Sequence, residues 1–102
     1  MMSGFAQALA EDRRLAILRL LVEAAGEANE SMLCQGLELV GHSAELTRDN
    51  VRADLKFLDD RALVTLTYFN DVLWVARITR RGVEVSQGKT HIEGVKHPSI
   101  GD

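Results

Sequence analysis

The sequence predicts a mainly α-helical α+β domain, in which three helices precede a small two-stranded β-hairpin and a short C-terminal helix. Apolar residues recur at helical spacing up to about residue 61. From residue 64 to residue 78 the apolar period changes to two, which is typical of half-buried strands. The chain has 102 residues and is expected to form one domain, since domains usually contain about 100–150 residues.

The first helical pattern extends from Phe5 to Ala25 and allows a break near Glu11–Asp12. It is apolar on two nearly opposite sides, with Leu15, Leu18, Val22 and Ala25 on one and Ile17, Leu20 and Ala24 on the other. A helix with two apolar faces must bury both. The second face is expected to meet another subunit or the chain's own tail, unless the whole helix lies within the core of its own domain. Gly26 is expected to end this helix.

Two further helices follow. Glu27–Glu30 is expected to be a polar connection, and Ser31 is expected to cap a helix that ends near Val40. The side chains expected to point inward from it are Met32, Leu33, Leu37 and Val40. After a short turn, Thr47 is expected to cap a third helix from Arg48 to about Arg61. Its core stripe consists of Val51, Leu55 and Leu58, which stand at i, i+4 and i+7.

The hairpin begins at Val64–Tyr68, where apolar and hydroxyl residues alternate. A turn at Phe69–Asp71 leads to a return strand over Val72–Ile78, in which one face carries Trp74, Ala76 and Ile78. Thr79 is expected to cap the last helix, Arg80–Ser86, which Gly88 ends. The tail, residues 89–102, is expected to be extended.

The formal net charge of −3 is unevenly distributed. Residues 1–46 carry three bases and seven acids, whereas residues 47–102 carry nine bases and eight acids. A basic patch for nucleic acid must therefore lie in the second half. The single cysteine, Cys34, excludes an internal disulfide and fits a reducing compartment. No apolar stretch approaches the ~18 residues of a membrane span, and no signal peptide is expected, so the sequence predicts a cytoplasmic protein.

The stretch LTRDNVRADLKFLDDRALV, residues 46–64, resembles the recognition-helix region of winged-helix repressors of the ArsR and MarR type. The matching positions are Leu46, Thr47, Val51, Leu55, Leu58, Leu63 and Val64, without a gap. The stretch ARITRRGVEVSQG, residues 76–88, resembles the second wing strand and the start of the final helix in the same families. Three helices, a hairpin and a terminal helix also form the element order of a winged helix. The resemblance covers roughly Asp12 to Gly88.

This resemblance implies a winged helix-turn-helix domain over residues 1–88, with an N-terminal helical extension and a tail at residues 89–102. It implies a DNA-binding transcriptional regulator that forms a homodimer through the N-terminal helix and the C-terminal tail. The short length and the tail EGVKHPSIGD, residues 93–102, resemble the small winged-helix proteins of Mu-like prophages. Two features depart from the pattern: Ala62 stands where glycine is usual, and the wing tip Phe69–Asp71 has no arginine or lysine.

The third helix would read the major groove with the side opposite its core stripe. The candidate DNA-binding residues are Thr47, Arg48, Asn50, Arg52, Ala53, Lys56, Arg77, Arg80 and Arg81. Among them, Arg48, Asn50 and Arg52 would supply base contacts, Ala53 would allow close approach, and Lys56 would hold phosphate. Arg77, Arg80 and Arg81 would contact phosphate or pair with Asp59 and Asp60. The alternative is that the arginine and lysine side chains of the third helix only keep the exposed face of a surface helix soluble.

Other classes of function find less support. A thiolate metal sensor needs two or three cysteines, and the three histidines are far apart in the sequence, so neither a metal site nor another cofactor is expected. No nucleophile stands in a motif with a base, so an enzyme is not expected. The second hypothesis is a winged-helix module for protein–protein interaction, in phage assembly or against a host factor. A third is a small-molecule sensor with a pocket between subunits.

Overall fold

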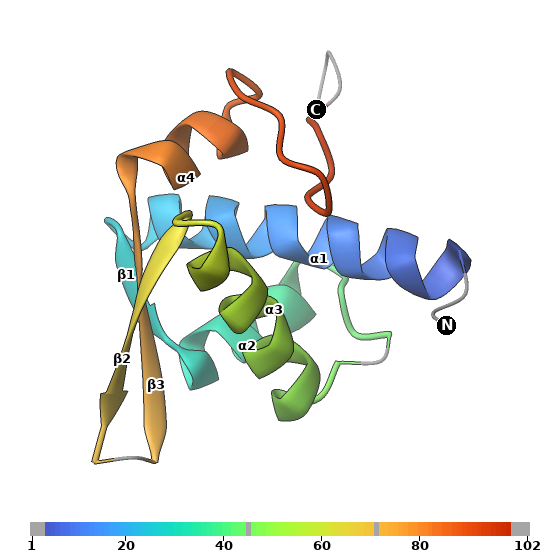
Figure 1. The fold of residues 1–102 in the computed structure, drawn as a ribbon. Coiled ribbons are helices and arrows are strands. Elements are labelled where there is room, and N and C mark those ends of the chain that lie inside the picture. Colours follow the sequence, from blue (N-terminus) through green and yellow to red (C-terminus); the bar gives the residue numbers. More distant parts are fainter. Residues whose placement is uncertain (1–3, 45, 71, 99–102) are drawn as a thin grey trace.

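The computed structural model describes residues 4–44, 46–70 and 72–98. These residues form four helices and a three-stranded antiparallel sheet, as Figure 1 shows. In chain order the elements are α1 (Gly4–Glu23), β1 (Glu27–Asn29), α2 (Glu30–Leu39), α3 (Arg48–Asp60), β2 (Val64–Phe69), β3 (Leu73–Ile78) and α4 (Arg80–Ser86). The α+β class predicted from the sequence is confirmed. No described helix is long and apolar enough to cross a membrane.

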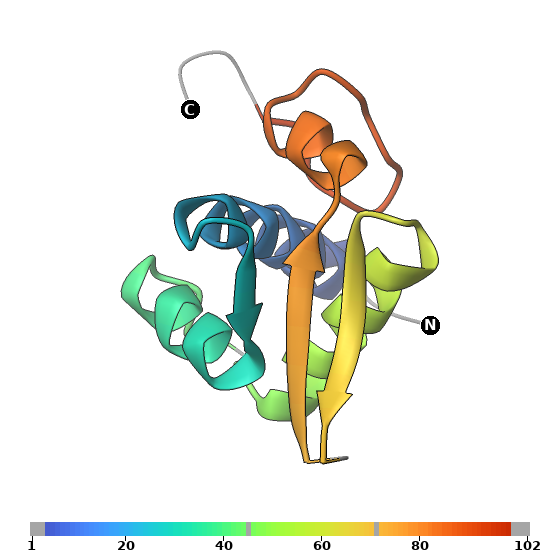
Figure 2. The ribbon, with the colours of Figure 1, turned by 90° about the vertical axis from the view of Figure 1, so that its left-hand side faces the viewer.

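The sheet has the strand order β1-β3-β2. The expected hairpin is confirmed as β2 and β3, which pair from Val64 opposite Ile78 to Phe69 opposite Leu73. The polar connection expected at Glu27–Glu30 is wrong, because Glu27–Asn29 forms β1 and pairs with the other edge of β3 (Figure 2). Only Ala28 of this short strand is buried. β1 therefore depends on the edge that β3 offers and not on an apolar pattern of its own.

α1 runs through the middle of the molecule, with α4 and the tail on one side and α2 and α3 on the other (Figure 1). The helix is continuous, so the break allowed near Glu11–Asp12 does not occur. The tail expected to be extended instead turns and packs back onto α1 over residues 89–98. The backbone N–H of Lys96 donates to the carbonyl of Glu11 at 3.2 Å, and Val95 is buried in the core. The chain's own tail thus covers part of α1, beside Glu11 and Asp12.

The helix starts are set by polar caps. Thr47 and Thr79 cap α3 and α4 as expected. The cap expected at Ser31 is wrong, because the side chain of Asn29 accepts a hydrogen bond from the Met32 N–H at 2.8 Å, and α2 begins at Glu30. Asn29 can do this because, as the last residue of β1, it has the extended backbone of an N-cap.

The inward face of α2 is narrower than expected. It carries Glu30, Leu33 and Leu37, at i, i+3 and i+7, whereas Met32 and Val40 are exposed. Met32 lies one residue before Leu33 and so beside this stripe, and Val40 follows the end of the helix. α2 approaches α1 closely, because Gly36 leaves room for Leu20 of α1.

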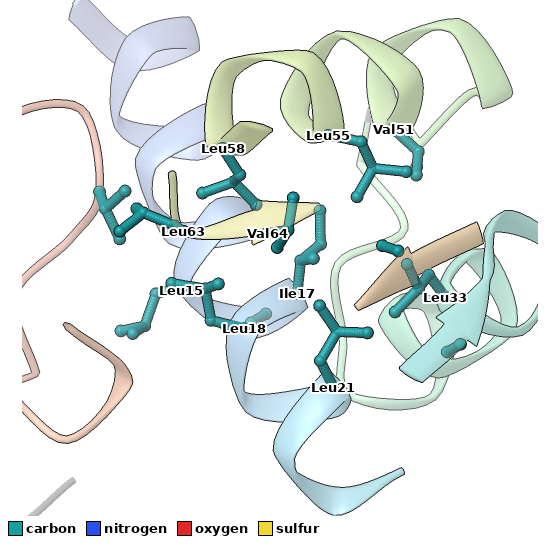
Figure 3. Close-up of a cluster of buried hydrophobic side chains, with 14 of the residues drawn as sticks. Leu15, Ile17, Leu18, Leu21, Leu33, Val51, Leu55, Leu58, Leu63 and Val64 are labelled. Atoms are coloured by element: carbon teal, nitrogen blue, oxygen red, sulfur yellow. The ribbon is translucent and has the colours of Figure 1, made fainter. Parts of the chain in front are cut away.

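The core joins all parts of the fold. Figure 3 shows side chains of α1, α2, α3 and the start of β2 meeting in one cluster, which includes Leu15, Ile17, Leu18, Leu21, Leu33, Val51, Leu55, Leu58, Leu63 and Val64. The predicted stripe of α3, Val51–Leu55–Leu58, is fully buried in it. This burial determines which side of α3 faces the solvent.

Candidate nucleic-acid interface

α3 turns one side to the core and the opposite side to the solvent. The exposed side carries Arg48, Asp49, Ala53 and Lys56. At the start of the helix the hydroxyl of Thr47 accepts a hydrogen bond from the Asn50 N–H at 3.0 Å, and the acid in the first turn suits the helix dipole. Thr47 is thus used as a cap. The side chain of Asn50 is half-buried.

Arg48 lies where the N-terminal ends of α2 and α3 approach each other. Its Nη2 donates to Ser31 Oγ at 3.3 Å, and the arginine side chain is otherwise exposed. A single neutral acceptor at this distance holds the guanidinium weakly, so Arg48 remains available to an anion. Lys56 is exposed two turns further along the same helix.

Arg52, which was expected to contact a base, instead forms an ion pair with Glu30 of the same chain. Its Nε and Nη2 donate to the two carboxylate oxygens of Glu30 at 2.6 and 2.7 Å. The Glu30 side chain is 0 % exposed and also accepts the Trp74 N–H at 3.1 Å. The hydrogen bond from Arg52 lowers the pKa of Glu30, against the opposing effect of burial, and the same bond raises the pKa of Arg52.

The role of Glu30 was not found from the sequence, where it stands in a polar stretch. A signal was present, because Glu30 stands three residues before Leu33 and seven before Leu37, on the buried stripe of α2. A carboxylate on such a stripe must find a partner, because an unpaired buried charge is very costly.

Asp54 forms a second buried ion-pair network on α3. Its side chain is 1 % exposed and is paired with Arg13 and with Arg14, whose Nε lies 3.1 Å from Oδ1. Asp54 stands three residues after Val51 and one before Leu55, and so lies on the core stripe of α3. Glu30 and Asp54 therefore do not add negative charge to the exposed side of α3.

The remaining bases lie elsewhere. Arg77 pairs with Glu27 on β1 at 3.3 Å, and not with Asp59 or Asp60. Arg80 and Arg81 are exposed at the start of α4. Thr79, just before them, donates from its N–H to the Leu63 carbonyl and from its hydroxyl to the Ala62 carbonyl, at 3.1 and 2.7 Å.

The candidate residues thus form two separate groups. The start of α4 lies beside the C-terminal end of α3, whereas Arg48 lies at its N-terminal end. Because α3 has 13 residues, the two ends are about 20 Å apart. The structure brings Arg48, Ala53 and Lys56 together on one helix face and places Arg80 and Arg81 away from Arg48.

No group of three or more His, Cys, Asp or Glu side chains among the described residues is arranged to hold a metal ion. His91 and His97, six residues apart, lie edge to face with ring centroids 5.6 Å apart, and the Nε2 of His97 lies 3.1 Å from the Gly88 carbonyl oxygen. Burial raises the pKa of the Cys34 thiol, which disfavours the thiolate that a metal or a nucleophilic reaction needs.

A groove of about 360 Å³ runs along α1, and none of its lining residues belongs to α3 or the hairpin. Its apolar lining comes from α1 and from the residue that follows α2, and its polar rim includes one residue of the tail. The lining residues are Asp12, Leu15, Ala16, Arg19, Leu20, Glu23, Val40, His42 and Lys96. The amine of Lys96 lies 3.4 Å from the carboxylate of Asp12 at this rim.

Comparison with known proteins reveals homologues, one of which is a phage protein. No protein-family model matches the chain, and no solved structure matches it significantly. The uncharacterized protein gp26 of Escherichia phage Mu is 41 % identical over 90 residues, which cover 88 % of this chain and 91 % of gp26. An uncharacterized protein of Haemophilus influenzae is 40 % identical over 83 residues, 81 % of this chain and 79 % of that protein. The phage relationship predicted from the sequence is thereby confirmed, and the chain belongs to the family that includes phage Mu gp26.

Proposed function

We propose that this domain is a winged helix-turn-helix and that it binds double-stranded DNA with α3, as a transcriptional regulator of phage type in the bacterial cytoplasm. The observation that carries the proposal is the exposed face of α3, where Arg48, Ala53 and Lys56 lie together on a helix capped by Thr47. The order of helices α1 to α3, hairpin and α4 agrees with the element order of a winged helix.

The chemistry of this face suits a major groove. Arg48, at the N-terminal turn, can donate two hydrogen bonds to the O6 and N7 atoms of guanine. Asn50, on the flank of the same turn, belongs to the type that pairs with adenine. The small Ala53 allows the helix to approach the bases, and Lys56 lies about 12 Å along the helix, where it can hold a phosphate. Because Glu30 and Asp54 are paired with arginines, these two carboxylates add no negative charge to this face, on which Asp49 is the acid of the N-terminal turn.

The test is selection of bound duplexes from a random pool at low salt, followed by affinity measurements on the selected sequence. Arg48→Ala is expected to relax the preference at one base-pair position and to cost about 1–3 kcal/mol. Lys56→Ala is expected to weaken all duplexes alike and to reduce the slope of log affinity against log salt by about 0.9.

The matched control is Lys89→Ala, which removes an equal charge from the exposed surface after α4. It is expected to leave both the preference and the salt slope unchanged. Failure to retain any duplex at low salt, or equal effects of Lys89→Ala and Arg48→Ala, would contradict the proposal.

A second function, as a protein-interaction module, is favoured by the tip of the hairpin. Tyr68, Phe69 and Val72 are exposed there, the last two at 65 % and 67 %, and the described residues of the tip, 68–70 and 72, include no base. An apolar, uncharged tip is more typical of a contact with protein than of a contact with phosphate. If no duplex is retained while Phe69→Ser abolishes binding to a phage-encoded protein, this second function replaces the first.

We also propose a homodimer formed through α1. Phe5 is 75 % exposed and stands seven residues before Asp12 and fourteen before Arg19, so it lies on the stripe of α1 that lines the groove. If two copies of α1 pair antiparallel about Asp12, Phe5 of each copy lies about 10 Å from the axis, beside Arg19 and Leu20 of the other. Each Asp12 near the axis is neutralised by Lys96 of its own chain.

A further inference from the structure

Arg52 connects three elements that are otherwise separate in the sequence. It projects from α3, binds the buried carboxylate of Glu30 on α2 and donates from Nη2 to the Val72 carbonyl at the tip of the hairpin, at 3.0 Å. Its guanidinium also lies over the ring of Trp74 on β3, 4.8 Å from the centroid. The backbone N–H of Trp74 in turn donates to Glu30, and the Trp74 ring packs edge to face against Tyr68 of β2.

These contacts need an arginine. The planar guanidinium uses two nitrogens on the two Glu30 oxygens and still reaches the Val72 carbonyl and the indole face. A lysine ammonium is a point charge on a flexible stem and cannot form this set of contacts at once. Glu30 is fully buried, so releasing Arg52 would leave its carboxylate with one hydrogen-bond donor among the described residues, the backbone N–H of Trp74.

A base-reading role would require that release. A guanidinium that turns outward to reach a guanine must break both bonds to Glu30, and an uncompensated buried carboxylate is strongly destabilising. Arg48, in contrast, has one hydrogen bond to give up among the described residues, to Ser31 Oγ at 3.3 Å.

We propose that Arg52 is a positioning residue, which holds the β2–β3 hairpin at a set angle to α3 through Glu30 and Trp74 and does not contact DNA bases. The hairpin angle is a property of the protein alone. Only the consequence for DNA rests on the proposed function, so the two parts are tested separately.

The first test uses the wild-type protein and the NMR signals of arginine Nε–H groups. The Arg52 Nε–H is expected to be resolved and slow to exchange with water. The matched comparison is Arg77, which forms an ion pair of the same chemistry with Glu27 on the exposed side of the hairpin. Equally rapid exchange at Arg52 and Arg77 would overturn the proposal without any variant having to fold.

The second test follows the hairpin in Arg52→Lys and Glu30→Gln. Hydrogen exchange of the Trp74 backbone N–H is expected to become about tenfold faster or more in Arg52→Lys, the factor for a lost charge-assisted hydrogen bond, with α1 and α4 unchanged. Glu30→Gln retains a neutral acceptor and is expected to show a smaller effect. Trp74 is the only tryptophan of the chain, so its fluorescence emission should shift to the red in the same order.

Arg77→Lys is the control in this experiment and is expected to leave Trp74 exchange and emission unchanged. If Arg52→Lys accelerates exchange equally throughout the chain, or not at all in the hairpin, Arg52 does not position the hairpin.

The third test compares DNA preferences. Arg52→Lys is expected to lower affinity for all selected duplexes by a common factor and to leave the preferred sequence unchanged, whereas Arg48→Ala changes the preference at one position. A changed preference with unaltered hairpin exchange would make Arg52 a base-reading residue. If no duplex binds, the proposed function fails, while the two protein measurements still decide the role of Arg52.

Discussion

Glu30 and Asp54 are buried carboxylates that hold α3 from two sides. Glu30 binds Arg52 near the N-terminal half of the helix, and Asp54 binds Arg13 and Arg14 of α1 from its middle. Such pairs contribute little net stability when complete, because desolvation offsets the attraction between the charges. Their loss is costly when only one partner is removed, by about 3–5 kcal/mol. They therefore constrain the orientation of α3 more than they stabilise the fold.

The lowered pKa of Glu30 predicts a contribution to stability that depends on pH. The pKa lies below its ordinary value of 4.5 because Arg52 hydrogen-bonds the charged form. The contribution is thus fully present above pH 4.5 and is lost as the pH falls through the lower pKa of the folded protein. Urea unfolding between pH 7 and pH 3 should show a steeper loss of stability in wild type than in Glu30→Gln.

The control for this measurement is Glu27→Gln, which removes a carboxylate from an exposed ion pair on the same sheet. Its acid limb should run nearly parallel to that of wild type. If the acid limb of Glu30→Gln also ran parallel to that of wild type, Glu30 would contribute nothing to the loss of stability in acid.

Ala62 occupies a position that favours glycine. α3 ends with the N–H groups of Ala62 and Leu63 donating to the carbonyls of Asp59 and Leu58, and the φ of Ala62 is 61°. This left-handed conformation costs a residue with a Cβ about 1–2 kcal/mol. The sequence departs from the winged-helix pattern here, yet the turn has the same geometry that glycine would give.

Ala62→Gly is expected to raise the free energy of unfolding by about 0.5–1 kcal/mol, since relief of the strain exceeds the entropy that glycine adds to the unfolded chain. Thermal or urea unfolding measures it. Ala53→Gly, on the exposed side of the same helix, should do the opposite and lose about 1 kcal/mol. Destabilisation by both substitutions would contradict the assignment of strain to Ala62.

At the scale of elements, the tail contacts α3 at one aromatic ring, that of Phe57. Phe57 lies between the guanidinium groups of Arg14 and Arg61, 3.8 and 3.4 Å from its centroid. Gly94 of the tail approaches the edge of this ring so closely that an added Cβ would lie 2.2 Å from its Cζ. Arg14 also donates to the Gly94 carbonyl at 2.9 Å. The tail, α1 and α3 therefore meet at this point.

Gly94→Ala is expected to destabilise the protein by about 2–4 kcal/mol, because the strain of a positive φ adds to the overlap with Phe57. Gly41 provides a matched control, since its φ of +93° is close to the +95° of Gly94 and an added Cβ there meets nothing within 4 Å. Gly41→Ala should cost only the backbone strain, about 1–2 kcal/mol. Equal losses of unfolding free energy in the two variants, measured in urea, would mean that a Cβ at position 94 does not overlap with Phe57.

At the scale of the whole molecule, the two ends of α1 are complementary. The exposed Phe5 lies at one end and the groove lined by Leu20 and Val40 lies toward the other. Two copies related by a twofold axis could place each phenylalanine in the groove of the partner, so that the same contact forms twice. The tail contributes through Lys96 at the rim of the groove.

Phe5→Lys is therefore expected to convert a dimer into a monomer, because it replaces the apolar side chain with a cation beside Arg19 of the other copy. Light scattering after size-exclusion chromatography measures the mass. Val72→Lys changes a similarly exposed apolar side chain at the hairpin tip and should leave the dimer intact. A wild-type protein that elutes as a monomer at high concentration would refute the α1 interface.

The sequence by itself determined the elements that carry strong local signals. The stripe of Val51, Leu55 and Leu58, the threonine caps and the change of period at Val64 depend on neighbouring residues, so α3, α4 and the hairpin were predicted close to their observed bounds. The exposed positions of Arg48 and Lys56 followed from the same periodicity.

Only the tertiary structure decided what depends on contacts between distant segments. β1 exists because β3 offers a free edge, and the tail folds back because Val95 and Gly94 find α1 and Phe57. Arg52 looked like a base-reading residue from α3 alone. Its partner Glu30 lies 22 positions away, and only the packing of α2 beside α3 brings the buried carboxylate within hydrogen-bonding distance of the guanidinium. Burying that carboxylate without a partner would be costly, and this cost determines the direction of the Arg52 side chain. No local pattern of apolar spacing indicates it.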